Sequence, residues 1–305
     1  MRQEQTRSDI ERLFEDRNNW GRWGVDDEVG ALNLITAQKR VAAASLVTSG
    51  RTVSLSRAVP TEPAANNPRP AQHYLRRDPI GAVDYYGLEY HGQASTHIDA
   101  LCHVFDQDGR LWNGRHADDV ITSYGAKWAG IEKWQNGLVT RGVLLDVPAF
   151  RNERFVRSGR PVTACELAEV AQTQGIVPES GDALVIYSGR DRWDEENIVW
   201  GGEKGSDGVV IRPGVDPSCL SYIRDCDCSA LAWDMMDAAP NQLGGIPWNV
   251  HGAIPSFGVA LVDNCELGAL AEACREEQRY EFMFMVAPLV VVGGTGSPAN
   301  PLALF

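Results

Sequence analysis

Short blocks of apolar residues alternate along the chain with polar segments that contain glycine and proline, and these blocks predict the strands. They lie at residues 53–55, 140–147, 184–187 and 230–233. Apolar runs of this length, bounded by turn-forming residues, are typical of strands buried inside a sheet. A further apolar segment, residues 282–292, predicts a strand pair or one bent strand interrupted at Pro288, because proline has no N–H to donate to a ladder.

Capping residues mark the predicted helices in the first half of the chain. Residues 37–48 follow Thr36, which is a favoured helix cap, and Gly50 lies just beyond them. Residues 1–19 are charged and predict a helix on the surface of the protein.

Two more helices are predicted in the second half of the chain. Thr163 and Glu166 form a capping-box pattern, which begins a helix that ends before Gly175. Residues 266–275 are also expected to be helical, with Asn264 as the candidate cap.

Residues 57–90 contain many Pro, Asn, Arg and Tyr residues without clear periodicity, and they predict a long loop. Loops of this length in compact domains are often functional. The predicted strands and helices are mixed without strict alternation, which favours a mixed α/β or α+β architecture. We expect one domain over residues 1–305, with an N-terminal helical extension at 1–52 and the loop insertion at 57–90.

Charge and cysteine usage exclude several classes of protein. The net charge of −13 argues against nucleic acid or an anionic membrane as a partner, because both reward clustered lysine and arginine. The seven cysteines are irregularly spaced, which favours reduced thiols over a disulfide framework. No signal-peptide pattern and no apolar run of about 20 residues is visible, so we expect a cytoplasmic protein.

Candidate chemistry gathers around residues 91–103, where three of the six histidines lie. If residues 93–99 are extended, Gln93, His97 and Asp99 lie on one face of the strand. An imidazole and a carboxylate that converge there would suit Zn²⁺ or Mn²⁺, although a buried hydrogen-bonded His–Asp pair has the same spacing. His103 could act as a ligand or as a general base, and His91 could replace Gln93 in a different register.

The segment Gln93-Ala-Ser-Thr-His97-Ile-Asp99-Ala-Leu-Cys-His103 resembles a family signature that runs His-x-Gly-Thr-His-x-Asp-x-Pro-x-His. The signature is that of the cyclase-like metal-dependent hydrolases, which include bacterial kynurenine formamidase and isatin hydrolase. Further segments resemble the family in the same order along the chain, at residues 23–33, 141–146, 176–186, 288–289 and 293–298.

The resemblance implies a set of metal ligands and a catalytic residue. His97 and Asp99 match family ligands, and His103 matches the histidine that transfers protons in the formamidases. The family's later histidine and acidic ligand correspond to His251 and Asp263, with Asp in place of the usual Glu. Gln93 stands where the first signature histidine is expected and offers only a weak oxygen ligand, which favours one Zn²⁺ or Mn²⁺ ion over two.

The resemblance also implies a fold and an activity. The expected fold is the swivelling β/β/α type, a mixed sheet core flanked by helices, assembled as a homodimer or homotetramer. The expected reaction opens a small cyclic amide or lactone, or cleaves an aryl amide, by means of a metal-activated water. Aromatic side chains expected to line the substrate pocket are those of Tyr85, Tyr86, Trp112 and Trp248.

Other functions remain as alternatives. One is an arylformamidase that hydrolyses N-formylkynurenine, and another is a catalytically silent small-molecule binder of the same fold. The glycine-rich segment 293–296 lacks the Lys-Ser/Thr ending of a phosphate-binding loop, and the chain has no Gly-x-Ser-x-Gly elbow of a serine hydrolase.

Overall fold

The computed structural model describes residues 6–196, 199–201, 203–241 and 249–305. Their main feature is a nine-stranded mixed sheet in the order β1-β13-β11-β7-β8-β9-β10-β4-β12. The sheet strands are β1 (Thr52–Ser54), β4 (His97–Asp99), β7 (Leu138–Asp146), β8 (Ala183–Tyr187), β9 (Ala230–Trp233), β10 (Ala260–Asp263), β11 (Glu281–Val286), β12 (Gly296–Pro298) and β13 (Leu302–Leu304). Two separate hairpins pair β2 (Gln72–Asp78) with β3 (Gly81–Gly87), and β5 (Ile121–Thr122) with β6 (Gly125–Ala126).

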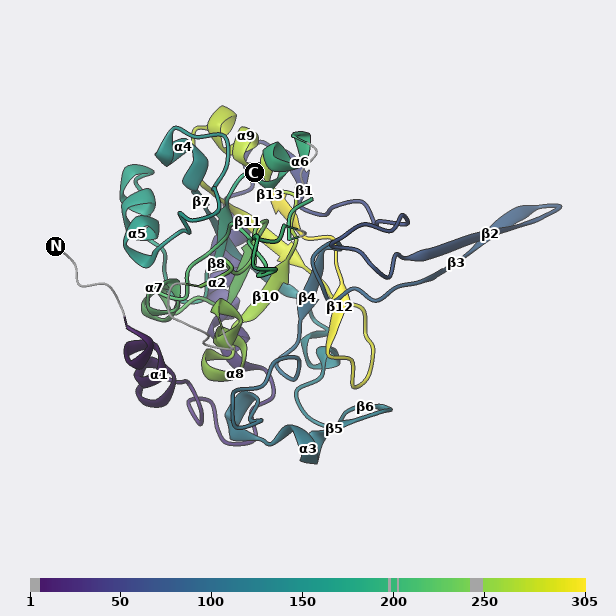
Figure 1. Ribbon diagram of the computed structural model, residues 1–305, viewed down its shortest axis with the longest axis horizontal. Helices are drawn as coiled ribbons and strands as arrows, with labels where there is room; N and C mark the ends of the chain where they lie inside the picture. The colour runs from purple at the N-terminus through teal and green to yellow at the C-terminus, as the bar shows by residue number, and fades with distance from the viewer. Residues whose placement is uncertain (1–5, 197–198, 202, 242–248) are drawn as a thin grey trace.

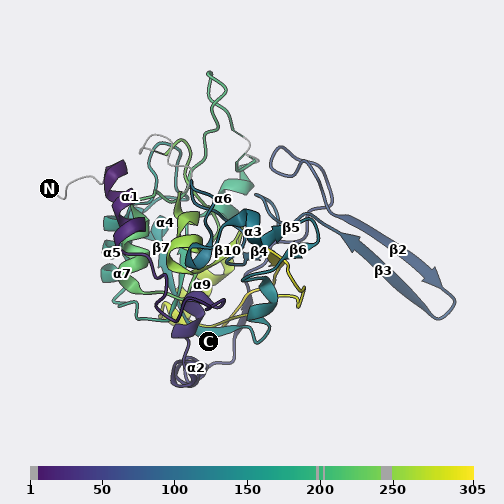
Figure 2. The same cartoon turned by 90° about the horizontal axis from the view of Figure 1, so that it is seen from below.

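Helices surround this sheet, as Figures 1 and 2 show. They are α1 (Arg7–Asp16), α2 (Ala37–Ala44), α3 (Ala117–Val120), α4 (Val147–Arg151), α5 (Ala164–Thr173), α6 (Arg190–Glu195), α7 (Cys219–Cys226), α8 (Ala253–Phe257) and α9 (Gly268–Glu277). Helix α2 packs on β7 and β11, and α5 and α9 also pack on β7. Among the described residues, none of the helices combines the length and apolarity that crossing a bilayer requires.

The centre of the sheet consists of β7, β8, β9 and β10, which run parallel to one another. Every residue of β8, β9 and β10 is buried, which explains why these strands appear in the sequence as continuous apolar runs. The predicted strands at 140–147, 184–187 and 230–233 are confirmed. Parallel strands end at the same edge of a sheet, so the carboxyl ends of β9 and β10 lie together, and ligand sites commonly form at this edge.

The predicted helix caps are confirmed at two positions and wrong at a third. The side chains of Thr36 and Thr163 accept hydrogen bonds from backbone N–H groups at the starts of α2 and α5. Asn264 does not cap α9, which begins at Gly268. Its side chain instead donates hydrogen bonds to the carbonyls of Gly92 and Ser95, and so holds the loop that precedes β4.

The segment 57–90 differs from the predicted long loop, because it contains the β2–β3 hairpin. This hairpin projects from the body of the molecule as an arm (Figure 1). Its strand residues are almost all exposed on both faces, so the sequence carries no alternation that could reveal the strands. In the segment 282–292, the strand β11 ends at Val286, ahead of Pro288, and no second strand follows directly.

Candidate metal centre

The centre is built on the short strand β4 and its neighbour β10. The Nε2 atom of His97 lies 3.4 Å from Oδ1 of Asp99, as expected for alternate residues on one face of a strand. Strand β10 runs antiparallel to β4 and places Asp263 directly opposite His97. Residues opposite each other also share a face, and Nε2 of His97 lies 3.8 Å from Oδ2 of Asp263. Strand pairing therefore brings together three side chains from two distant parts of the sequence.

His251 reaches the same place from the short 3₁₀ helix Val250–Gly252. Its Nε2 atom lies 3.1 Å from Oδ2 of Asp263 and 3.9 Å from Oδ2 of Asp99. Its Nδ1 atom is hydrogen-bonded to Oδ2 of Asp237, whose Oδ1 accepts the backbone N–H of Val250 at 2.6 Å. Asp237 thereby holds the imidazole with Nε2 toward the other two carboxylates.

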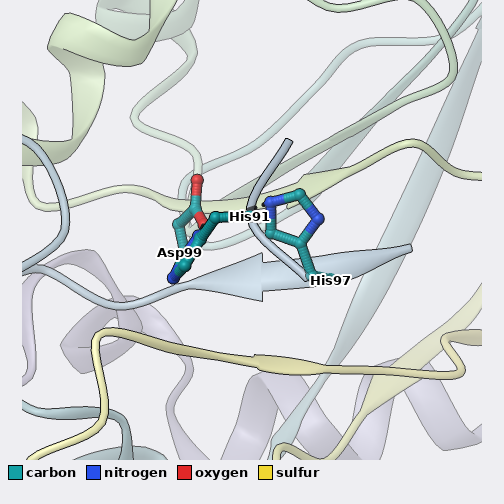
Figure 3. A group of neighbouring side chains, drawn as sticks. All are labelled: His91, His97 and Asp99. Atoms are coloured by element: carbon teal, nitrogen blue, oxygen red, sulfur yellow. Dashed lines mark ion pairs between the residues drawn. The ribbon is translucent and has the colours of Figure 1, made fainter. Parts of the chain in front are cut away.

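His91 joins the centre from the loop between β3 and β4 (Figure 3). Its Nδ1 atom lies 3.0 Å from Oδ1 of Asp99, and its Nε2 atom is hydrogen-bonded to the hydroxyl of Thr295 at 3.1 Å. The ring stacks on His103 with a centroid separation of 3.8 Å and an interplanar angle of 7°. Gly296 leaves room for this arrangement, because a Cβ atom added there would lie 2.8 Å from the His91 ring.

The carboxylate of Asp99 connects the two halves of the centre. The first group of potential ligands consists of His91, His97 and Asp99, and the second consists of Asp99, His251 and Asp263. Within each group the potential ligand atoms lie within 4.8 Å of one another. Asp99 is completely buried, and among the residues that the structure describes its oxygens contact imidazole nitrogens, with Nδ1 of His91 3.0 Å from Oδ1, but accept no hydrogen bond from a backbone N–H or a hydroxyl group. Such a buried carboxylate is costly unless a cation compensates it. The residues therefore fit a divalent metal ion with nitrogen and oxygen ligands.

Burial and neighbouring charges lower the pKa of Asp99 and of His103 and raise the pKa of His251. Burial by itself would raise the pKa of Asp99, but the neighbouring His103 and His97 outweigh it and lower this pKa. Burial lowers the pKa of His103 to about 4, although the charge of Asp99 opposes this change. Burial also disfavours the charged form of His251, but Asp237 and then Asp263 outweigh it and raise the pKa of His251 well above its usual value. The closely spaced carboxylates therefore create a negative potential that attracts cations.

Two residues of the centre did not emerge from the sequence analysis, namely Trp233 and Asp237. Trp233 is the last residue of β9, and its indole N–H donates a hydrogen bond to Oδ1 of Asp263. This contact leaves Oδ2 of Asp263 facing His251 and His97. Trp233 ends the predicted strand 230–233, and Asp237 follows that strand closely. A position at the carboxyl end of a buried strand is the signal that could have identified both residues.

The predicted position of Gln93 as the first ligand is wrong, because residues 93–99 are not one extended strand. Strand β4 begins only at His97, and residues 91–95 form bends. The Gln93 side chain packs against Gly201, where an added Cβ atom would lie 2.2 Å from its Oε1 atom. His91 is the residue that contacts Asp99, as the alternative register allowed.

The predicted aromatic pocket also requires correction. Tyr85 and Tyr86 lie on the exposed arm, away from the centre. Trp112 is completely buried, donates a hydrogen bond to the backbone carbonyl of Asp27 and therefore belongs to the core. Trp248 lies outside the described residues. The aromatic residues that the structure places at the centre are Trp233 and Tyr90, whose ring centroid lies 4.5 Å from that of His91.

Comparisons with known proteins agree with this architecture. A family model described as "Putative cyclase" matches residues 38–240. A crystal structure described as a novel cyclase superposes with a TM-score of 0.81 at 29% identity, covering 96% of this chain and 99% of that chain. No curated protein sequence matches the chain.

More distant structures share the fold. Isatin hydrolase A from Labrenzia aggregata, bound to benzyl benzoate, superposes with a TM-score of 0.59 at 16% identity, covering 88% of this chain and 98% of that chain. A predicted metal-dependent hydrolase from Bacillus stearothermophilus gives a TM-score of 0.52 at 13% identity, with 84% of this chain and 98% of that chain covered. The mixed sheet flanked by helices is thus the fold expected from the sequence.

Proposed function

Because this chain belongs to the cyclase family, we propose that it is a metal-dependent hydrolase that opens a small cyclic amide or lactone, or cleaves an aryl amide. The observation that carries the proposal is the buried carboxylate of Asp99, whose oxygens lie 3.0–3.9 Å from the nitrogens of four imidazoles and accept no hydrogen bond from a backbone N–H or a hydroxyl group among the described residues. A divalent ion is the group that such a carboxylate and such imidazoles bind together. Two neighbours of similar fold carry hydrolase names, which supports the same class of reaction.

The proposed ligands are His91, His97, Asp99, His251 and Asp263, which make up the two ligand groups. Zn²⁺ and Mn²⁺ both accept nitrogen and carboxylate ligands. When bound, such an ion supplies Lewis acidity and lowers the pKa of a water molecule.

His103 is the proposed proton-transfer residue. Its Nε2 atom lies 3.9 Å from Oδ1 of Asp99, next to the proposed ligands, and its side chain is 28% exposed. The imidazole is therefore both close to the centre and open to a small molecule. A histidine in this position can take a proton from the attacking water and deliver one to the leaving group.

The number of ions is open to direct measurement. The sequence favoured a single ion because Gln93 replaces the first signature histidine. His91 supplies the missing imidazole, so the described residues offer two ligand groups that share Asp99. A titration that saturates at one ion per chain would keep the single-ion proposal, and saturation at two would replace it.

The proposal is tested by metal reconstitution and a small substrate panel. Protein stripped with a chelator is expected to bind Zn²⁺ or Mn²⁺ in calorimetric titration and to regain hydrolysis of a small lactone or a cyclic aryl amide such as isatin. A reconstituted protein that binds neither ion would contradict the proposal.

The same panel separates the alternatives. Turnover of N-formylkynurenine without turnover of the cyclic compounds would identify an arylformamidase. A tightly bound ion without turnover of any compound would favour the silent small-molecule binder.

Replacing Asp237 by asparagine is expected to weaken metal binding although Asp237 is not a proposed ligand. The amide would donate to Nδ1 of His251 where the carboxylate now accepts, and the ring proton would move to Nε2, the nitrogen that faces Asp99 and Asp263. We expect ion affinity to fall by about 10- to 100-fold, the range for residues that orient a ligand.

Calorimetry measures this affinity, and the ¹⁵N chemical shifts of His251 report its tautomer. Asp146→Asn is the matched control, because Asp146 is also buried but accepts the backbone N–H of Ala149 at the start of α4. Unchanged ion affinity in Asp237→Asn would show that Asp237 does not orient the ligand.

A further inference from the structure

The β2–β3 arm exposes aromatic and aliphatic side chains on both of its faces. Tyr74 and Tyr85 are stacked on one face with a centroid separation of 6.0 Å, and Tyr86 lies opposite His73 on the other face. The exposed apolar residues of the arm are Tyr74, Leu75, Ile80, Val83, Tyr85 and Tyr86, which are 51–101% exposed. An isolated two-stranded hairpin is only marginally stable in water, and exposed apolar patches commonly mark interaction sites. We therefore expect the arm to pack against another protein surface.

A second exposed apolar surface lies on the body of the molecule, and we call it the valine patch. It consists of Leu289, Val290, Val291, Val292 and Tyr124. Tyr124 belongs to it because the β5–β6 hairpin is joined to this loop by a hydrogen bond from the N–H of Ala126 to the carbonyl of Gly293 at 2.8 Å. The loop precedes the edge strand β12, on the side of the molecule from which the arm projects (Figures 1 and 2).

We propose that the arm and the valine patch form an interface with a second copy of this chain, in which each arm packs on the valine patch of the other copy. The two surfaces lie on one side of the molecule, as a two-fold symmetric interface requires. In such an interface the arm of each copy contacts the valine patch of the other copy. The inference does not rest on the proposed hydrolase activity. It gives a location to the homodimer contact expected from the sequence.

Charge is compatible with a second copy as the partner. The chain carries a net charge of −13, so two copies repel each other, and this repulsion is smallest where the contact surfaces themselves carry no acidic excess. Within the arm, Arg76 and Arg77 balance Asp78 and Asp84, and residues 287–301 contain no charged residue at all. The two surfaces are therefore neutral regions of a strongly acidic protein.

The area of the arm also favours a reciprocal exchange. Each of its strands has seven residues, so one face covers roughly 220 Å² at about 3.3 Å per residue and about 4.8 Å between strands. One arm that packs a single face on the valine patch would bury roughly 440 Å², counting both partners, which is far less than the about 1,000 Å² that a specific interface requires. Two exchanged arms would bury roughly 900 Å², which comes close to that size, so the contact has to be reciprocal.

The experiment compares the mass of the full chain in solution with that of two variants. Light scattering after size exclusion is expected to give a dimer of the 33.4-kDa chain for the wild type. The double variants Tyr74→Ser/Tyr86→Ser and Val290→Ser/Val292→Ser are each expected to raise the dimer dissociation constant at least about 10-fold, because aromatic and buried apolar contacts dominate interfaces. Val177→Ser removes an equally exposed valine outside both surfaces and should leave the dimer unchanged.

Amide hydrogen exchange of the wild type provides a test that needs no variant. The arm amides are expected to be protected at high protein concentration and to exchange rapidly after dilution below the dissociation constant. A wild type that is monomeric at about 100 μM, or arm variants that dimerise as tightly as the wild type, would overturn the proposal. Equal exchange of the arm at both concentrations, with the dimer dissociated on dilution, would also overturn it.

Discussion

Replacing Asp99 by asparagine is expected to abolish metal binding and to lower kcat/KM by on the order of 10³-fold. Asp99 belongs to both ligand groups, so one substitution removes an anionic ligand from each. An asparagine offers only a neutral oxygen in its place. A bound metal contributes several kcal/mol to transition-state stabilisation, and each 1.36 kcal/mol corresponds to a tenfold change in rate.

The same substitution is expected to destabilise the metal-free protein as well. The neighbouring histidines lower the pKa of Asp99, so its charged carboxylate is stabilised in the folded state relative to the unfolded state, and the neutral amide loses this stabilisation. Chelator-treated Asp99→Asn should therefore unfold at a lower temperature than the chelator-treated wild type. Only the wild type should gain stability when Zn²⁺ or Mn²⁺ is added.

Asp234 provides the matched control for this experiment. It is equally buried, but its carboxylate accepts backbone N–H groups from Ser188, Gly189, Arg190 and Met235. Asp234→Asn should lower stability by about 1–3 kcal/mol, because the amide cannot accept all of these bonds, and it should still bind the ion. An Asp99→Asn variant that retains stoichiometric metal and full turnover would remove the basis of the proposed function.

Replacing His103 is expected to lower kcat by about 10²- to 10⁴-fold while the protein still binds metal. The imidazole lies beside the centre without belonging to either ligand group. His103→Phe is more informative than His103→Ala, because a phenyl ring can still stack on His91 but carries no nitrogen for proton transfer. Both variants should show the same loss of kcat.

Added imidazole should restore part of the activity of His103→Ala, because it can occupy the space of the missing ring. His116→Gln serves as the control, since His116 is an exposed histidine at the start of α3, and it should retain full activity. Full turnover of His103→Phe with metal bound would show that another group transfers the proton.

The strands of the sheet centre could be predicted because burial on both faces leaves a continuous apolar run in the sequence. That His97 and Asp99 lie on the same face of β4 could also be predicted, because alternate residues of a strand point to the same side. The resemblance to the cyclase-like hydrolases singled out His251 and Asp263. What the sequence did not reveal is the register of β4 with β10, which is the reason why Asp263 lies opposite His97.

The errors have physical causes that are equally specific. Gln93 was placed by extending the period of β4 backward into a segment that bends, and the bend brings His91 to Asp99 instead. The arm escaped detection because both of its faces are exposed, so no burial pattern marks its strands. Asp237 acts through His251, and a residue that orients a ligand has no spacing pattern of its own.

Strand β4 lies between β10 and β12 in the sheet, and both of these neighbours come much later in the chain. During synthesis on the ribosome, His97 and Asp99 emerge long before the segments that must flank them. They have no ladder partner until residues 260–263 and 296–298 have been translated. Ion loading is therefore expected to be a late event in the biogenesis of the protein, after the sheet has closed around β4.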